Sequence, residues 1–190
     1  MPRLSKYCAT LLLVCCPAVG VSQAVDPYDH PVAKPLLPAQ HAAISKTRAL
    51  VLTKMGCTIQ QFSDSPGLDG VVSGAFRQPG TNDQAVLCHQ RNESVVVVFW
   101  EGQDTVSTTV GREPFRAQRQ IYLANRAYVV EHLAYYGSEA AGIPKEPDSP
   151  SLRARLTLLV THDGIGDGSG CCSMTHYWTG KLWAQYPGAD

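Results

Sequence analysis

The side chains with the clearest chemical potential in this sequence lie near its C-terminus. His162 and Asp163 are neighbours, and His176 follows on the next predicted element. A histidine supported by a carboxylate can act as a general base, and a nearby serine or cysteine could then serve as the nucleophile. No nucleophile elbow or other local signature accompanies these residues. The pattern allows a hydrolase that uses His162 or His176 with Asp163, but it does not require one.

The same region could also bind a metal ion. Residues 162–170, HDGIGDGSG, are predicted to form a glycine-rich loop, in which Asp163, Asp167 and Ser169 could present oxygen ligands. An EF-hand loop beginning at Asp163 would need an acid at its third position, where the sequence has Ile165, and a glutamate at its twelfth. The alternative is a flexible loop whose aspartates stabilise their own turns. We therefore expect no bound metal and no cofactor.

Aromatic residues dominate the last predicted element, a hairpin over residues 173–186 that turns at Thr179-Gly180. Tyr177, Trp178 and Trp183 lie on its two strands. Aromatic residues in cross-strand pairs mostly stabilise a hairpin or a core. Aromatic residues exposed on one face would instead suit a sugar or a protein partner. These three residues are therefore candidates for a binding surface.

A second loop, within GAFRQPGTNDQAVLC (residues 74–88), raises the question of calcium. The wider segment 69–100 resembles a single FG-GAP or VCBS-type repeat. In this resemblance Gly74–Phe76 match the entry strand, Asp83 matches the last acid of the loop, and Ala85–Leu87 match the exit strand. The resemblance implies a β-hairpin, and in the calcium-binding members of these families the loop holds the ion.

The loop departs from that pattern where the carboxylates would be needed. Arg77 stands in place of an acid, and only Asn82 and Asp83 offer side-chain oxygens to a cation that takes 6–8 oxygen ligands. We expect a tight turn rather than a calcium site. The segments HLAYYG and TGKLWAQYPGAD also resemble small secreted bacterial proteins that carry one such hairpin. This wider resemblance implies no specific activity.

The N-terminus has the features of an export signal. Residues 1–24 combine a basic start, a short apolar stretch and small residues at Ser22 and Ala24, which predicts cleavage after Ala24. The apolar stretch is shorter than the roughly 20 residues that a bilayer requires. The alternative is a lipoprotein acylated at Cys15 or Cys16. Residues 25–38 are then a proline-rich extended leader, and 39–190 form one domain, secreted or periplasmic.

Charge and cysteine content agree with an exported protein that does not bind nucleic acid. Two of the 16 basic residues fall in the predicted signal, which leaves 14 against 16 acidic residues and no basic face. Four cysteines remain, and an oxidising compartment favours disulfides. We predict a Cys57–Cys88 bridge, because a helix packed on a sheet could bring them together. The state of Cys171 and Cys172 stays open.

The remaining pattern is mixed helix and strand. Residues 39–55 and 125–137 predict helices, the second capped by Asn125. The apolar run Val95–Trp100 predicts a central strand that is covered on both faces. Further strands are predicted at 70–76, 84–90, 105–110, 119–124 and 153–161, and a surface loop at 138–151.

Short turns between neighbouring strands favour an α+β domain, with a mainly antiparallel sheet of five to seven strands packed against two helices. Because no set of catalytic, metal or phosphate-binding residues is complete, we expect a non-enzymatic binding or interaction module. Its ligand would be a protein, a small molecule or a sugar, and no transmembrane segment is expected. The alternative function is the hydrolase described above.

Overall fold

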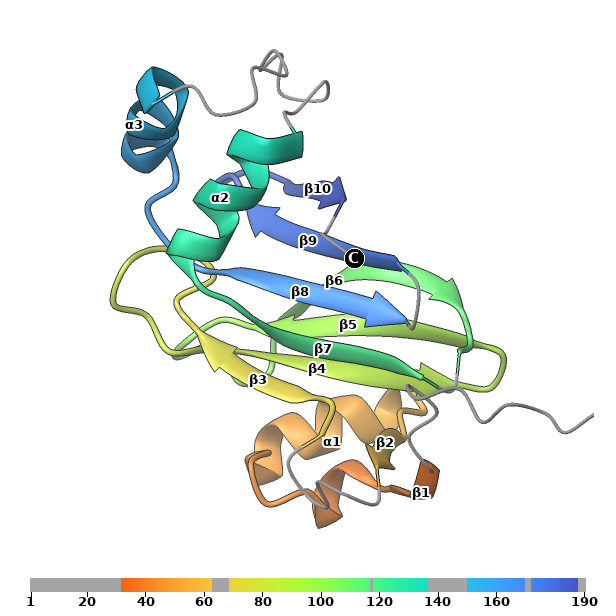
Figure 1. Ribbon diagram of the computed structural model, residues 1–190. Helices are drawn as coiled ribbons and strands as arrows, with labels where there is room; N and C mark the ends of the chain where they lie inside the picture. Colours follow the sequence, from red (N-terminus) through yellow and green to blue (C-terminus); the bar gives the residue numbers. More distant parts are fainter. Residues whose placement is uncertain (1–31, 63–68, 117, 137–149, 170–171, 188–190) are drawn as a thin grey trace, which may run out of the picture.

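Two four-stranded antiparallel sheets form the centre of the fold (Figure 1). The computed structural model describes residues 32–62, 69–116, 118–136, 150–169 and 172–187. Sheet I has the order β3-β4-β5-β6, with bounds Val71–Gly74, Asp83–Gln90, Glu93–Phe99 and Ser107–Pro114. Sheet II has the order β10-β9-β8-β7, with bounds Trp183–Pro187, Cys172–Trp178, Gly164–Ser169 and Arg119–Ala124. A small separate sheet pairs β1 (Val32–Leu36) with β2 (Ile59–Phe62).

Helices cover the outer faces of both sheets, which gives the fold four layers (Figure 1). α1 (Lys46–Lys54), preceded by the short 3₁₀ helix η1 (Pro38–Gln40), packs on sheet I. α2 (Arg126–Tyr136) packs on sheet II, and α3 (Pro150–Leu159) packs on α2. A third apolar core lies between the sheets and is formed by Phe76, Ala85, Leu87, Val96, Val98, Val110, Ile121 and Ile165.

The position of β5 between two apolar cores explains why its sequence is continuously apolar. Val95, Val97 and Phe99 belong to the core shared with α1, whereas Val96 and Val98 belong to the core between the sheets. Successive side chains of a strand point to opposite faces, so a strand covered on both sides needs apolar residues at every position. The predicted central strand is confirmed.

The predicted disulfide joins α1 to sheet I. Cys57 follows α1, Cys88 lies on β4, and the two form a disulfide with a Cα–Cα distance of 5.0 Å. Gly56 has a positive φ of 74°, which ends the helix and turns the chain toward the sheet. Cys171 lies outside the described residues, and Cys172 is described only as the first residue of β9.

The two predicted helices are present, with the first one shorter than expected. Ser45 caps α1 by accepting a hydrogen bond of 3.3 Å from the Arg48 amide, so the helix begins at Lys46. Asn125 caps α2 by accepting a hydrogen bond of 3.0 Å from the Tyr128 amide, as predicted. The predicted strands from 70 to 124 correspond to β3–β7.

The strand predicted at 153–161 is wrong, because this segment belongs to the helix α3. Pro150 stands at its first position, where a proline is well tolerated. Leu156 and Val160, four residues apart, are buried against α2, whereas Leu158 and Leu159 are exposed. The apolar centre of this segment therefore has the spacing of a helix face and not that of a strand.

The glycine-rich loop predicted at 162–170 is also wrong, because residues Gly164–Ser169 form the strand β8. Its glycines alternate with larger residues, and Gly166 lies directly under the ring of Tyr122 on β7. A Cβ atom at Gly166 would stand 2.1 Å from that ring, so the glycine allows the close approach. In GIGDGS glycine alternates with a larger residue, and this period of two is the pattern that indicates a strand.

The α+β class with antiparallel sheets is confirmed. Within the described residues there are ten strands in three sheets and three α-helices, more elements than the single sheet and two helices that were expected. β1 lies in the segment expected to be an extended leader, and it pairs with β2. The predicted signal peptide and most of the predicted loop 138–151 lie outside the described residues. None of the described helices is long and apolar enough to span a bilayer.

Candidate functional site

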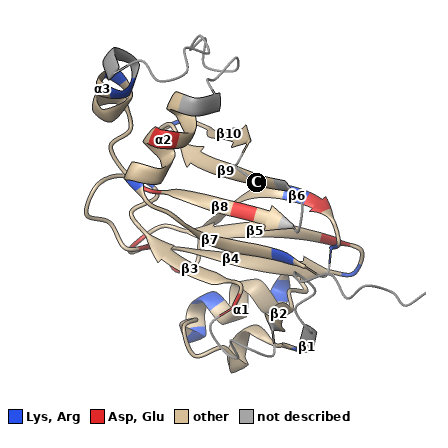
Figure 2. Ribbon diagram, viewed as in Figure 1, with Lys and Arg blue, Asp and Glu red and all other residues tan. Residues whose placement is uncertain are grey.

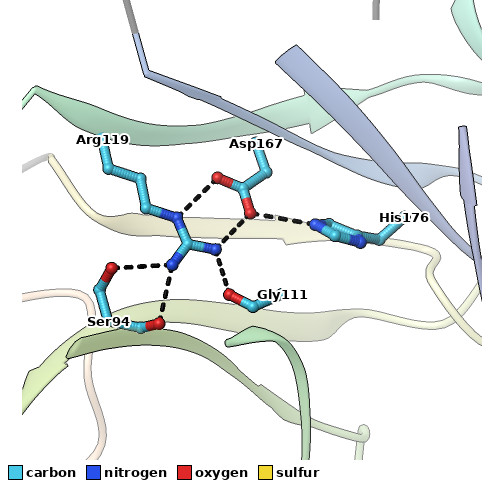
Figure 3. A network of polar contacts seen from close by, with 5 residues as sticks. All are labelled: Ser94, Gly111, Arg119, Asp167 and His176. Atoms are coloured by element: carbon cyan, nitrogen blue, oxygen red, sulfur yellow. Dashed lines mark hydrogen bonds and ion pairs between the residues drawn. The ribbon is translucent and has the colours of Figure 1, made fainter. Parts of the chain in front are cut away.

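A buried polar network connects the two sheets (Figure 3). Arg119 on β7 donates from Nε to Asp167 Oδ1 on β8 at 2.8 Å, and its Nη2 pairs with Asp167 Oδ2. From Nη1 it donates to both the carbonyl and the hydroxyl of Ser94 on β5, each at 2.8 Å. His176 on β9 contacts Asp167 Oδ2 through Nε2 at 3.0 Å. We call Arg119, Asp167, His176 and Ser94 the buried network.

The guanidinium of Arg119 keeps the neighbouring carboxylate charged. Burial alone would raise the pKa of the Asp167 carboxyl, but hydrogen bonds and charge from Arg119 and His176 outweigh it and hold the pKa below its usual range. Arg119 itself is fully buried. A buried charge of this kind is stable only when it is paired and hydrogen-bonded.

A glycine makes room for this network. Gly111 on β6 has a positive φ of 61°, and its carbonyl accepts a hydrogen bond from Arg119 Nη2. A Cβ atom at Gly111 would stand 2.8 Å from Arg119 Nη2 and 2.9 Å from both Asp167 Oδ2 and His176 Nε2. Both the backbone conformation and the lack of space therefore require glycine.

The structure does not bring the predicted catalytic residues together. His176 points between the sheets, where its strand neighbour Ile165 also lies. His162 stacks on Tyr177, with ring centroids 4.3 Å apart, and Tyr177 faces α2 on the opposite side of sheet II. Because sheet II separates the two histidines, they cannot serve one reaction centre.

Asp163 has a structural role that the sequence did not indicate. Its Oδ2 accepts a hydrogen bond of 3.1 Å from the Ala75 amide after β3, and its Oδ1 accepts one of 3.0 Å from the Arg126 amide at the start of α2. The Asp163 amide donates to the Ala75 carbonyl in return. The hydrogen bonds of this aspartate therefore connect the end of β3 in sheet I with the start of α2, the helix that packs on sheet II.

The predicted metal ligands are spread along a strand. Asp167 lies four positions after Asp163, which corresponds to about 13 Å of extended chain. Asp167 belongs to the buried network, and Ser169 lies at the end of β8. Within the described ranges no group of three or more His, Cys, Asp or Glu side chains is placed to hold a metal ion.

The loop that resembles a calcium-binding hairpin is organised by its own aspartate. Asp83 is fully buried, and its Oδ2 accepts hydrogen bonds from the Arg77 amide at 2.9 Å and the Thr81 hydroxyl at 2.7 Å. Its Oδ1 accepts a hydrogen bond of 2.8 Å from the Glu101 amide. The carboxylate thus stabilises the turn by bonding to the donors around it.

The tryptophans gather at one end of the space between the sheets. The sequence contains three, Trp100, Trp178 and Trp183, and their ring centroids lie 5.5–5.7 Å apart. The guanidinium carbon of Arg77 lies 5.8 Å above the ring centre of Trp100, the geometry of a cation–π contact. Trp178 and Trp183 were predicted candidates, whereas Trp100 and Arg77 were not.

A pocket of about 340 Å³ opens beside this cluster, and we call it the Trp178 pocket. Its volume lies at the lower end of the roughly 300–1,000 Å³ that ligand sites occupy. It unites three predicted candidates with side chains from distant parts of the chain. The lining includes Arg77, Thr161, His162, Tyr177, Trp178 and Thr179.

Several polar groups of the pocket are left free by the fold. His162 Nδ1 donates to the Asp163 carbonyl at 2.9 Å, and its other ring nitrogen has no hydrogen bond within the described part of the chain. The Tyr177 hydroxyl accepts a hydrogen bond of 3.2 Å from the Thr161 amide and can still donate its own proton. Thr179 differs, because its hydroxyl is used by Leu182 in the hairpin turn.

A larger hollow of about 750 Å³ lies between the end of α1 and the β4–β5 turn. Its lining combines charges of both signs, including Glu93 paired with Arg112. No aromatic side chain lines it, and none of the predicted site residues lies there. Basic and acidic residues are also distributed over many elements of the fold (Figure 2). The smaller Trp178 pocket is therefore the better candidate site.

The sequence indicated only part of this site. Tyr177, Trp178 and His162 were recognised from their residue types. Arg77 was noted only because it stands where a calcium-binding loop would need an acidic residue. Pairing of Trp100 with the C-terminal hairpin depends on how the two sheets stack, which no local pattern reveals. Comparison of the chain with protein-family models, curated proteins and solved structures gives no match.

Proposed function

We propose that this protein is a non-enzymatic binding module and that the Trp178 pocket holds its ligand. The supporting observation is the meeting of Arg77, His162, Tyr177 and Trp178, from three separate segments, in one open pocket with unused hydrogen-bonding groups. Binding sites typically combine apolar or aromatic walls with a few convergent polar groups. Arg77 and Trp178 supply the charged and the aromatic part.

The environment of the histidines favours binding over the alternative hydrolase. His162 bonds through Nδ1 to a backbone carbonyl, and the Asp163 carboxylate is engaged by two backbone amides instead of the imidazole. His176 is paired with Asp167, but it is buried in the network between the sheets. A general base must reach its substrate, which excludes His176. His162 lines the pocket, but it has no carboxylate partner among the described residues, and the pocket lining contains no serine or cysteine for it to activate.

We further propose that the protein acts outside the cytoplasm, secreted or periplasmic. The Cys57–Cys88 disulfide supports an oxidising compartment, in which such bonds persist. The predicted cleavage after Ala24 agrees with this assignment. Intact-mass measurement of the exported protein should give Val25 as the first residue, and an acylated N-terminal Cys15 or Cys16 would instead identify a lipoprotein.

A fragment screen tests the binding site without assuming the ligand. Trp178 lines the pocket and contacts the other two tryptophans, so its indole N–H resonance in ¹H–¹⁵N NMR spectra reports on ligand binding. We expect fragments that shift the Trp178 resonance in the wild-type protein but not in Thr161→Phe, which fills the pocket from an exposed position. Thr53→Phe, on α1 beyond sheet I, is the matched control. A screen in which no fragment distinguishes the two variants would contradict the proposal.

A further inference from the structure

The charge of the Trp178 pocket indicates the kind of ligand it accepts. Arg77 contributes a permanent positive charge, and no carboxylate is part of the pocket lining. Lys181 directly follows the lining residue Gly180 and is exposed, which adds a second positive charge near the rim. Two carboxylates neighbour lining residues: Asp163 follows His162 in the chain, and Asp83 accepts a hydrogen bond from the Arg77 amide. Both are engaged by hydrogen-bond donors of the fold and lie outside the lining. The pocket therefore favours an anionic group.

Arg77 is also free to bind such a group. In the described ranges its side chain has no ion pair, and its buried Nε has no hydrogen-bond partner. Other arginines of the fold are engaged, for example Arg48 with Asp104 and Arg126 with the carbonyls of Val160 and Thr157. The contact with Trp100 places the guanidinium carbon of Arg77 5.8 Å from the ring centre. A guanidinium matches a carboxylate, which it can bind through two parallel hydrogen bonds.

The remaining polar groups suit hydroxyls. Because a carbonyl oxygen can only accept, the bond from His162 Nδ1 to Asp163 places the proton of the neutral ring on Nδ1 and leaves Nε2 as an acceptor. The Tyr177 hydroxyl still has a proton to donate, and the exposed Thr161 hydroxyl can do both. Sugar hydroxyls both donate and accept, so they complement this mixed set.

The indole of Trp178 supplies the surface on which a sugar ring can lie. Its ring centre lies 5.5 Å from those of Trp100 and Trp183, and Trp178 is part of the pocket lining. The face of an indole carries negative charge density, which attracts the weakly positive C–H groups of a pyranose. A flat aromatic carboxylate would instead need an enclosed apolar slot, whereas this pocket is open and has mostly polar side chains in its lining.

We infer that the ligand of the Trp178 pocket is an acidic saccharide, whose carboxylate binds Arg77, whose hydroxyls meet His162 and Tyr177, and whose ring packs on Trp178. This inference rests on the proposed binding function and specifies its ligand class. It goes beyond that function, because a binding module could equally hold a neutral or an apolar ligand.

Two methyl glycosides that differ only in the charged group provide the test. Methyl β-D-glucuronide carries a carboxylate where methyl β-D-glucoside carries a hydroxymethyl group, and their affinities can be compared by NMR titration of the indole resonances. We expect the glucuronide to bind at least tenfold more tightly than the glucoside, and Arg77→Gln to reduce this ratio of affinities to less than twofold. Arg91→Gln, an exposed arginine in the β4–β5 turn, should leave both affinities unchanged.

Equal affinities of the two glycosides would overturn the inference, as would benzoate or acetate binding as tightly as the glucuronide. Absence of binding by both glycosides at tens of millimolar would overturn it as well. The proposed function fails separately: if the fragment screen finds ligands that Thr161→Phe excludes while neither glycoside binds, the pocket stands and only the ligand class is wrong.

Discussion

The buried network and the Trp178 pocket use the same residue types in opposite ways. Each contains an arginine and a histidine that come from different segments of the chain. Arg119 is fully buried, and its guanidinium donates to Asp167, Ser94 and Gly111. Arg77 lies over Trp100 beside an open pocket, and its Nε has no partner among the described residues. The first arginine is satisfied by the fold, and the second remains available to a ligand.

This difference shows that residue type alone does not identify a functional group. His176 and Asp167 form the better histidine–carboxylate pair, yet they lie where no substrate can reach them. His162 has a weaker set of partners and lines the pocket. Access and unused hydrogen-bonding capacity therefore distinguish the candidate site from the buried network.

The largest effect on stability should come from Arg119→Met. This change leaves the Asp167 carboxylate buried without its main partner, which typically destabilises a fold by about 3–5 kcal/mol. Arg77→Met should lose no more than about 1 kcal/mol, the value of an exposed cation–π contact. Denaturant unfolding of both variants measures the difference. Similar losses for the two arginines would contradict the distinction drawn between them.

Removal of the disulfide should destabilise the protein without affecting the pocket. Cys57 and Cys88 are separated by 31 residues, and the double variant to alanine should lose about 3–4 kcal/mol. The bond lies between α1 and the outer face of sheet I, away from both arginines. Where the variant is folded, its glucuronide affinity should equal that of the wild type. A changed affinity would show that the pocket depends on the α1 layer.

Acidification should lower the free energy of unfolding because His89 is buried as a neutral ring. Burial, and then the charge of Arg119, lower the pKa of His89 to about 4, so folding favours the neutral ring. Its contribution to stability is present above the unfolded pKa of about 6.5 and is lost as the pH falls toward 4, by about 1 kcal/mol per unit.

The variant His89→Phe isolates this contribution. Burial also lowers the pKa of His41 and His132, so these residues add to the acid sensitivity of the wild type in the same pH range. The difference in unfolding free energy between wild type and His89→Phe should change with pH between 6.5 and 4. A constant difference would show that His89 is not held neutral by the fold.

Asp163→Asn should have a smaller effect on stability than Arg119→Met or removal of the disulfide. The amide retains one oxygen acceptor but cannot accept hydrogen bonds at both the Ala75 and the Arg126 amides. Loss of one such bond should reduce stability by about 1–2 kcal/mol. Thermal unfolding measures this loss. An unchanged midpoint would show that the hydrogen bonds of Asp163 do not stabilise the fold, and a catalytic role of Asp163 would then have to be considered again.

Much of the fold could be predicted from local patterns. The continuous apolar run of β5 and the cap Asn125 each reflect an interaction within or directly around one element, whereas the cap Ser45 was missed and the first helix was expected to begin at residue 39. α3 and β8 were misread because leucines and glycines occur in several structures, and only the spacing of Leu156 with Val160, and of Gly164 with Gly166, separates them. These spacings were present in the sequence but were given too little weight.

The candidate site was less predictable. Trp178 and Tyr177 could be recognised as aromatic candidates, but sequence alone could not place Arg77 from one hairpin and His162 from another segment against them. The buried network was also missed, because Arg119, Ser94 and Asp167 are brought together only when the two sheets stack. Contacts between sheets depend on the whole topology, and no local period encodes them.

The most direct test compares the two arginines in one NMR experiment. Spectra recorded during addition of methyl β-D-glucuronide can follow the Nε–H resonances of Arg77 and Arg119 together with the Trp178 indole. The account predicts saturable shifts for Arg77 and Trp178, with the Arg119 resonance unchanged throughout. Shifts at Arg119 of the same size, or an Arg77 resonance that does not respond while Trp178 saturates, would contradict it.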